Sequence, residues 1–423
     1  MDVNTQLFDF IKNSPSAYHT VNSVKSELLK NGYKELCEED AWSIADGVGY
    51  FVIRNGTSII AFRAKNNANG FMIAASHSDS PSFRVKLIPE LSGAYTRLNV
   101  ERYGGMINYS WLDRPLSIAG RVVVRTERGI ESRLVNIDRD VAVIPSVAIH
   151  MNRGVNDGYK FNPAVDLLPF VASADGRGGI MTELSERAGV GEADIISHDL
   201  FLYNREEGRI FGSQNEFILA PRLDDLECVF ASLRAFLGAK SSNSIPVLAV
   251  FDNEEVGSET KQGAASTFLY DTIRRIASDS YEQMMASSFM VSADNAHAKH
   301  PNHPELADAE NAPMLNGGVV IKWNANQKYA TDGISDALFR TVCERAGAKT
   351  QVYYNRADMP GGSTLGSISN TKVSVPTVDI GLAQLAMHSA TETAGAQDVK
   401  ELIKVLTELF ETSLKKRGDS FEF

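Results

Sequence analysis

The chain has 423 residues, of which 43% are hydrophobic and 22% are charged, so it can form two or three folded units and is not a disordered chain. Its 42 basic and 53 acidic residues give a net charge of −11, which argues against nucleic acid as a partner because phosphate backbones are bound by clustered Lys and Arg. Three widely spaced cysteines and a first segment without the features of a signal peptide predict a cytoplasmic protein. No apolar stretch reaches about 18 residues, so no membrane span is expected.

The first third of the chain shows one helix and one buried strand. Apolar residues recur at helical spacing between Ser16 and Lys30, which predicts an amphipathic helix that ends before Gly32. Phe71–Ala75 is a continuous apolar run that stops at the polar sequence Ser-His-Ser-Asp-Ser, as a buried strand does where it enters a loop. The polar side chains therefore lie at the carboxyl end of this strand.

The middle of the chain has a different pattern. Its β-branched, alternating segments, such as Arg121–Arg125, are separated by turn residues. We assign Gly176–Gly179 to such a turn, because it lacks the strand-to-helix context of a phosphate-binding loop. We therefore predict a β-rich domain at 87–219, inserted into an α/β domain that consists of 1–86 and 220–423.

The remainder of the chain alternates between helices and strands. Apolar periodicity predicts helices at Leu223–Leu237 and Leu402–Leu409. Continuous apolar runs predict buried strands at Pro246–Phe251 and Phe289–Ala293, and both runs stop at ionisable residues. This alternation predicts an α/β sandwich whose functional side chains lie at the carboxyl ends of the strands.

His77 and Asp79 form a His-x-Asp pair immediately after the first buried strand. A neutral imidazole that binds a metal usually donates its other ring N–H to a carboxylate, and Asp79 lies at the right separation to accept it. Because such pairs also arise by chance in many chains, the pair indicates a metal site only together with further ligands.

Acidic residues occur in pairs at two further positions. Asp224 and Asp225 stand at the start of a predicted helix, where an aspartate most often caps free N–H groups. We assign Asp225 to this capping role and keep Asp224 as a candidate ligand. Glu254 and Glu255 follow a buried strand, and two adjacent carboxylates in that position need a cation. One can bind a metal while its neighbour takes a proton from the attacking water.

Asp294 and His388 complete the candidate ligands. Asp294 directly follows the third buried strand, and His388 follows an apolar segment. The full set contains two imidazoles and three carboxylates, namely His77, Asp224, Glu255, Asp294 and His388. Mixed nitrogen and oxygen ligands favour zinc, cobalt or manganese and exclude the thiolate coordination of structural zinc.

Seven motifs, taken together, resemble those of one family. They are His77-Ser-Asp-Ser-Pro81, Leu98-Asn-Val-Glu-Arg-Tyr-Gly-Gly105, Trp111-Leu-Asp-Arg-Pro-Leu-Ser117, Pro221-Arg-Leu-Asp224, Asp252-Asn-Glu-Glu-Val-Gly257, Asp294-Asn-Ala-His-Ala298 and Gly361-Gly-Ser-Thr364. In this order they are similar to the aspartyl aminopeptidase family of co-catalytic zinc metallopeptidases, and the similarity spans nearly the whole chain.

The resemblance implies a fold and a metal site. The fold is a mixed-sheet, three-layer metallopeptidase domain with an inserted β-rich dimerisation domain. The site holds two divalent ions, expected to be Zn²⁺, with Co²⁺ or Mn²⁺ as alternatives. Asp224 would bridge the two ions, His77 and Asp294 would complete the ligands of one, and Glu255 and His388 would complete the ligands of the other.

The resemblance also implies roles beyond metal binding. Glu254 would be the general base, and Asp79 would orient His77. His150, in the inserted region, matches a histidine that this family contributes to the active site of a neighbouring subunit, where it would donate to the oxyanion. The implied partners are peptide substrates and further copies of the chain, in a homo-oligomer built from dimers and as large as a dodecamer.

Of the properties considered, substrate preference is the one that the sequence determines least. The family's name implies substrates with acidic N-terminal residues, which need a cation in the substrate pocket. Lys322 is our candidate for this cation. The alternative interpretation is that Lys322 is a solvent-exposed lysine at the end of a strand. Gly361-Gly362 stands where the family often has Cys-Gly, so the resemblance does not determine the detailed shape of the substrate pocket. The alternative functions are a neutral-residue aminopeptidase, another amide hydrolase of the same clan, and a non-catalytic scaffold, which should have lost ligands that this chain retains.

Overall fold

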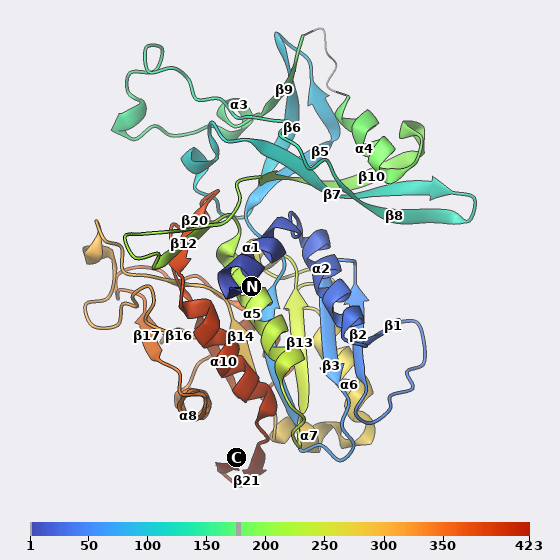
Figure 1. The fold of residues 1–423 in the computed structure, drawn as a ribbon, viewed down its shortest axis with the longest axis vertical. Helices are drawn as coiled ribbons and strands as arrows, with labels where there is room; N and C mark the ends of the chain where they lie inside the picture. Colours follow the sequence, from blue (N-terminus) through green and yellow to red (C-terminus); the bar gives the residue numbers. More distant parts are fainter. Residues whose placement is uncertain (1, 175–178) are drawn as a thin grey trace.

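A nine-stranded mixed sheet runs through the lower part of the molecule in Figure 1. The computed structural model describes residues 2–174 and 179–423. The strand order in this sheet is β1 (Lys34–Leu36), β2 (Gly49–Arg54), β3 (Ser58–Arg63), β13 (Ile245–Phe251), β4 (Phe71–His77), β14 (Phe289–Ala293), β18 (Thr377–Gly381), β16 (Val319–Trp323) and β17 (Thr350–Tyr354). β4 runs parallel to both β13 and β14, and all three strands are buried along their whole length. Burial on both faces explains their continuous apolar sequences.

Helices cover both faces of this sheet. One face packs against α1 (Val3–Lys12), α2 (Ala17–Lys30), α5 (Leu223–Gly238), α8 (Gly333–Ala346) and α10 (Asp398–Glu411). The opposite face packs against α6 (Phe268–Ala277), α7 (Tyr281–Ala286) and α9 (Leu365–Ser369). Alternation along the strands separates the two cores, so Phe51 lies in the first and Val52 in the second. The predicted three-layer α/β fold is confirmed.

A six-stranded antiparallel sheet lies at the top of the molecule in Figure 1. Its order is β8 (Gly129–Asn136), β7 (Leu116–Thr126), β10 (Ile195–Asn204), β5 (Ser82–Leu91), β6 (Tyr95–Tyr103) and β9 (Phe170–Ser173). Two short helices, α3 (Pro163–Asp166) and α4 (Ile180–Ala188), come from the same part of the chain. This sheet has an apolar core of its own, which includes Phe83, Val122 and Leu200.

A five-stranded sheet links distant parts of the chain. Its order is β11 (Arg209–Phe211), β12 (Phe217–Ala220), β20 (Glu392–Gly395), β19 (Ala383–Leu385) and β15 (Ala296–His297). β12 leads directly into α5, and the pairing of Ala220 with Glu392 places the start of α5 beside the segment that carries His388. β11 and the first three residues of β12 fall within 87–219, and β12 pairs with β20 from the C-terminal part of the chain, so the division into two domains stays a prediction. A hairpin of β21 (Lys415–Arg417) and β22 (Ser420–Glu422) ends the chain.

The local predictions agree with the observed elements. The three predicted helices correspond to α2, α5 and α10, and the three buried strands correspond to β4, β13 and β14. The predicted turn at Gly176–Gly179 lies outside the described residues, except for Gly179. All three cysteines, Cys37, Cys228 and Cys343, are unpaired. Within 2–174 and 179–423, no helix combines the length and the apolar character needed to cross a bilayer.

Candidate metal centre

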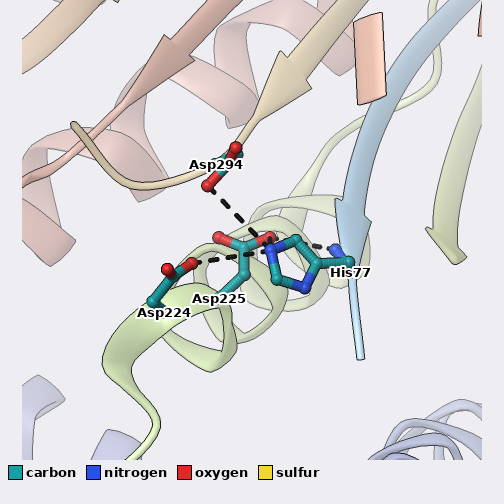
Figure 2. Close-up of side chains that lie close together, drawn as sticks. All are labelled: His77, Asp224, Asp225 and Asp294. Atoms are coloured by element: carbon teal, nitrogen blue, oxygen red, sulfur yellow. Dashed lines mark hydrogen bonds and ion pairs between the residues drawn. The ribbon is translucent and has the colours of Figure 1, made fainter. Parts of the chain in front are cut away.

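Three predicted ligands meet where parallel strands end. His77 is the last residue of β4, Asp294 follows β14, and Asp224 lies at the start of α5 (Figure 2). Nε2 of His77 lies 3.5 Å from Oδ1 of Asp224 and 3.9 Å from Oδ1 of Asp294. All three side chains are buried, and the start of α5 brings Asp224 to the edge of the sheet where the parallel strands β4 and β14 end.

A second group shares Asp224. Nε2 of His388 lies 3.3 Å from Oδ2 of Asp224 and 3.4 Å from Oε2 of Glu255. Glu254 and Glu255 belong to a short 3-10 helix, η4 (Glu254–Val256), directly after β13. One carboxylate oxygen of each glutamate and one ring nitrogen of His77 also lie within 4.8 Å of one another. The structure therefore brings together all five predicted ligands and Glu254.

The donor set fits a divalent cation. Oδ1 of Asp224 and Oε1 of Glu255 are buried, and among the described residues neither has a hydrogen-bond donor. Buried carboxylates without a partner are strongly destabilising unless a cation compensates them. The ligand atoms are imidazole nitrogen and carboxylate oxygen, the set typical of catalytic zinc. The cluster is therefore compatible with metal binding.

The carboxylates raise the proton affinity of their neighbours. Burial raises the pKa of Glu254 to about 8, with a further contribution from the charge of Asp294. Burial also raises the pKa of Glu255 well above its usual range. For His388, burial opposes the charged form, but the hydrogen bond with Asp224 and the negative charges of Glu255 and Asp224 together outweigh it and raise the pKa to about 10. Because a histidine binds a metal only when neutral, a cation at this site competes with protons.

Asp79 contacts His77, but the hydrogen bond goes to its backbone oxygen, whereas the sequence predicts its carboxylate as the acceptor. Nδ1 of His77 donates to the backbone carbonyl oxygen of Asp79 at 3.0 Å and lies 3.3 Å from its carboxylate oxygen Oδ1. The same carboxylate accepts the backbone N–H groups of Glu254 at 3.2 Å and Glu255 at 3.3 Å. With Nδ1 as a donor, Nε2 of His77 is left free to bind a metal.

The prediction that Asp225 caps a helix is wrong. Asp225 is fully buried, and its Oδ2 accepts the backbone N–H of His77 at 2.9 Å. The physical reason is that α5 begins irregularly, with non-helical backbone angles at Asp224 and Asp225, so both carboxylates turn towards the metal centre. Oδ1 of Asp225 has no donor among the described residues.

Glu392 is a residue of the site that the sequence reasoning missed. Its Oε1 accepts the backbone N–H of His388 at 2.7 Å, and its Oε2 accepts that of Asp224 at 3.1 Å. Burial raises its pKa to about 8. Nδ1 of His388 donates to the backbone oxygen of Gly105 at 2.7 Å, which leaves Nε2 facing Asp224. The one sequence signal for Glu392 was a carboxylate four residues after His388.

Lys322 is buried beside a candidate ligand. Its side chain is 2% exposed, so the alternative of a solvated lysine is wrong. Nζ donates to the backbone oxygens of Asp294 at 2.8 Å and Asn295 at 3.1 Å, and lies 3.4 Å from Oδ2 of Asp294. The burial follows from tertiary packing, because Lys322 belongs to β16 and its Nζ lies 5.3 Å from the ring centre of Tyr329.

His150 lies apart from this cluster in its own chain. It is exposed, in the loop between β8 and α3 that extends outwards at the top left of Figure 1. Val147, Ile149 and Met151, on the same short segment, are 52%, 47% and 78% exposed. The structure thus brings the predicted ligands, Glu254 and Asp79 together within one chain, but not His150.

Comparisons with known proteins agree with this geometry. The family model described as the aminopeptidase I zinc metalloprotease (M18) matches residues 10–410. A probable M18 family aminopeptidase 2 from Clostridium acetobutylicum is 44% identical over 422 residues, which cover 96% of this chain and 98% of that protein. A chain in the cryo-EM structure of the Ape4 and Nbr1 complex has a TM-score of 0.93 at 34% identity, covering 96% of this chain and 85% of its own. The S. cerevisiae mApe1 dodecamer gives a TM-score of 0.85 at 30% identity, covering 97% of this chain and 96% of its own.

These similarities extend over nearly the whole length of both partners, so they concern the complete fold and not a single motif. They confirm the metalloaminopeptidase class that the seven motifs predict. The chain belongs to the M18 family of aminopeptidase I zinc metalloproteases.

Proposed function

We propose that this aminopeptidase uses two divalent metal ions, with Zn²⁺ as the expected ion, to release N-terminal residues from peptides. The observation that carries the proposal is the placement of Asp224, whose two carboxylate oxygens face different histidines, His77 and His388. A carboxylate shared in this way suits a pair of ions. Asp294 is the remaining ligand on the side of His77, and Glu255 is the remaining ligand on the side of His388.

The proposed chemistry divides between the ions and the chain. When bound, the ions would lower the pKa of a water molecule and polarise the scissile carbonyl group. Glu254 accepts the proton of the attacking water and passes it to the leaving amine, and its carboxylate lies beside His77 and Glu255, where that water would be held. Asp79 keeps the ring of His77 in place through Nδ1. His150 of a neighbouring subunit donates to the developing oxyanion.

The dinuclear site predicts the metal content. We expect about two equivalents of Zn²⁺ per chain, measured by elemental analysis after the protein is stripped with a chelator, reloaded and dialysed. Co²⁺ and Mn²⁺ are expected to bind at the same ratio. Asp224→Asn should lose both ions, because Asp224 faces both histidines. Asp199→Asn is the matched control, since Asp199 pairs with Arg84 and Arg121 and should keep both ions. One ion per chain in the wild type would contradict the dinuclear mechanism and leave the aminopeptidase class intact.

We propose acidic N-terminal residues as the preferred substrates, with Lys322 as the cation that recognises them. A specific observation favours the alternative, a preference for neutral residues. The ammonium group of Lys322 has three partners already, two backbone oxygens and the carboxylate of Asp294. A substrate carboxylate would have to replace one of them. The comparison of substrates therefore decides between the two preferences.

Lys322→Met tests this recognition directly. If Lys322 binds the substrate, the ratio of kcat/KM for Asp and Glu substrates to kcat/KM for Leu and Ala substrates should fall by about tenfold or more, because a charge-assisted hydrogen bond is lost. The measurement uses fluorogenic N-terminal amino-acid substrates with zinc, cobalt and manganese. An equal loss for all substrates, accompanied by loss of metal, would instead assign Lys322 to holding Asp294 in place.

We propose a cytoplasmic homo-oligomer built from dimers, as large as a dodecamer. The dodecamer is described for the S. cerevisiae mApe1 structure, which is similar to this chain over 97% of its length. The exposed apolar side chains beside His150 support a contact between subunits, because such patches on a folded chain often mark interfaces. Three unpaired cysteines support a reducing compartment.

A further inference from the structure

Tyr103 connects the six-stranded sheet to the metal centre. It is the last residue of β6, where it pairs with Ser82, and its ring packs edge-on against Phe201 of β10 with 5.4 Å between ring centres. Its hydroxyl donates to Oδ2 of Asp79 at 2.6 Å and accepts from Nδ2 of Asn253 at 2.9 Å. The hydroxyl thus acts at once as donor and as acceptor beside the site.

Asp79 connects Tyr103 to the segment that carries Glu254 and Glu255. Its carboxylate is 4% exposed and accepts the backbone N–H groups of Glu254 and Glu255, one on each oxygen, at 3.2 and 3.3 Å. The hydroxyl of Tyr103 and the two backbone N–H groups thus hold the carboxylate between them, and its Oδ1 lies 3.3 Å from Nδ1 of His77.

The second contact of Tyr103 acts on the same segment from the other side. Asn253 directly precedes Glu254 and has a left-handed backbone with φ of 61°. Its side-chain oxygen accepts from Thr260 Oγ1 at 2.8 Å and Gln262 Nε2 at 2.9 Å, so its amide nitrogen is turned towards Tyr103. One hydroxyl group therefore holds both the residue before Glu254 and the carboxylate that binds the backbone of Glu254.

We propose that Tyr103 is a positioning residue, which sets the orientation of Glu254 through Asp79 and Asn253. It touches no reacting atom. Because Tyr103 comes from β6, the six-stranded sheet as well as the nine-stranded sheet determines where the base lies. The inference rests on the proposed role of Glu254 as general base.

Tyr103→Phe tests the role because it removes only the hydroxyl group. We expect kcat to fall about 10–100-fold, the range for partners that orient a metal site, with KM changed less than about twofold. Metal content should stay at the wild-type level. In the Co²⁺ protein the visible absorption bands should shift, because the contact of Asp79 with His77 is loosened.

Tyr18→Phe is the matched control. Tyr18 is buried and Tyr103 is half-buried, the hydroxyl of Tyr18 donates to the carboxylate of Asp199 at 3.1 Å, and both tyrosines line the same cavity of about 470 Å³. The two variants should lower the thermal midpoint to a similar extent. Only Tyr103→Phe should change kcat and the Co²⁺ spectrum. Equal kcat and unchanged spectra in both variants would overturn the inference.

Two further measurements separate the possible failures. In an Asp79→Asn background, adding Tyr103→Phe should lower kcat by a clearly smaller factor than in the wild type, since residues that act through one another are not additive and only the contact with Asn253 is left to lose. Full additivity would overturn the route through Asp79. Glu254→Gln is assayed alongside. If Glu254→Gln is inactive and Tyr103→Phe matches Tyr18→Phe, only the role of Tyr103 is wrong, whereas an active Glu254→Gln would overturn the proposed base.

Discussion

Glu254→Gln is expected to lower kcat by at least about 10²-fold while the protein keeps its metal. The substitution preserves the shape of the side chain and removes the oxygen that accepts the proton. The carboxylate of Glu254 lies near His77, but among the described residues no ion pair of 4.0 Å or less joins it to a histidine. The loss should therefore appear in the chemical step and not in metal binding.

Glu255→Gln should fail for a different reason. Oε2 of Glu255 lies 3.4 Å from Nε2 of His388, and its other oxygen is buried without a hydrogen-bond donor among the described residues. We expect this variant to lose metal during dialysis, because a neutral amide is a much weaker ligand than a carboxylate. Activity and metal content are measured on the same dialysed samples, the latter by elemental analysis.

The control for both variants is Glu259→Gln, which changes an exposed carboxylate shortly after the same segment. It should retain wild-type metal content and kcat. Equal loss of metal from Glu254→Gln and Glu255→Gln would show that the roles of base and ligand are wrongly divided. Full activity in Glu254→Gln would remove it from proton transfer altogether.

Several of the candidate ligands could be predicted because they follow a local signal. His77 and Asp294 come at or just after buried apolar strands, and adjacent parallel strands bring their carboxyl ends to one edge of the sheet. Glu254 and Glu255 follow the third such strand, which lies on the other side of β4. The three-layer fold follows from the same alternation of apolar strands and amphipathic helices.

The residues that hold the ligands in place depend on contacts across long stretches of chain. Glu392 reaches Asp224 only because β20 pairs with β12, and no local pattern specifies that register. The place of Asp225 beside the metal centre could not be predicted, because the irregular start of α5 depends on tertiary packing. The burial of Lys322 likewise depends on Asp294, which comes from another strand of the sheet. Local sequence therefore predicts the candidate ligands of this site better than it predicts the residues that hold them in place.

Mixing two inactive variants should restore activity, if the active site is shared between subunits. His150 is exposed in its own chain, whereas all five proposed ligands and Glu254 lie together within one chain. We expect His150→Ala and Glu254→Ala each to be nearly inactive, the first because the oxyanion loses its donor and the second because the base is absent. The exposed apolar residues around His150 mark the surface through which a second subunit would bind.

In a mixed dimer, the subunit with His150→Ala keeps its own Glu254 and receives an intact His150 from its partner, so one site of the two is complete. For pairing with two-fold symmetry and random mixing, half of the dimers are mixed, and the co-refolded sample should reach about one quarter of wild-type activity. Activity should rise with the fraction of mixed dimers, measured by differential tags. His150→Ala mixed with a chain carrying both substitutions is the control, and it should stay inactive because no site receives both groups. If demonstrated mixed dimers show no recovery, His150 acts within its own chain or not at all, and each subunit must then hold a complete active site.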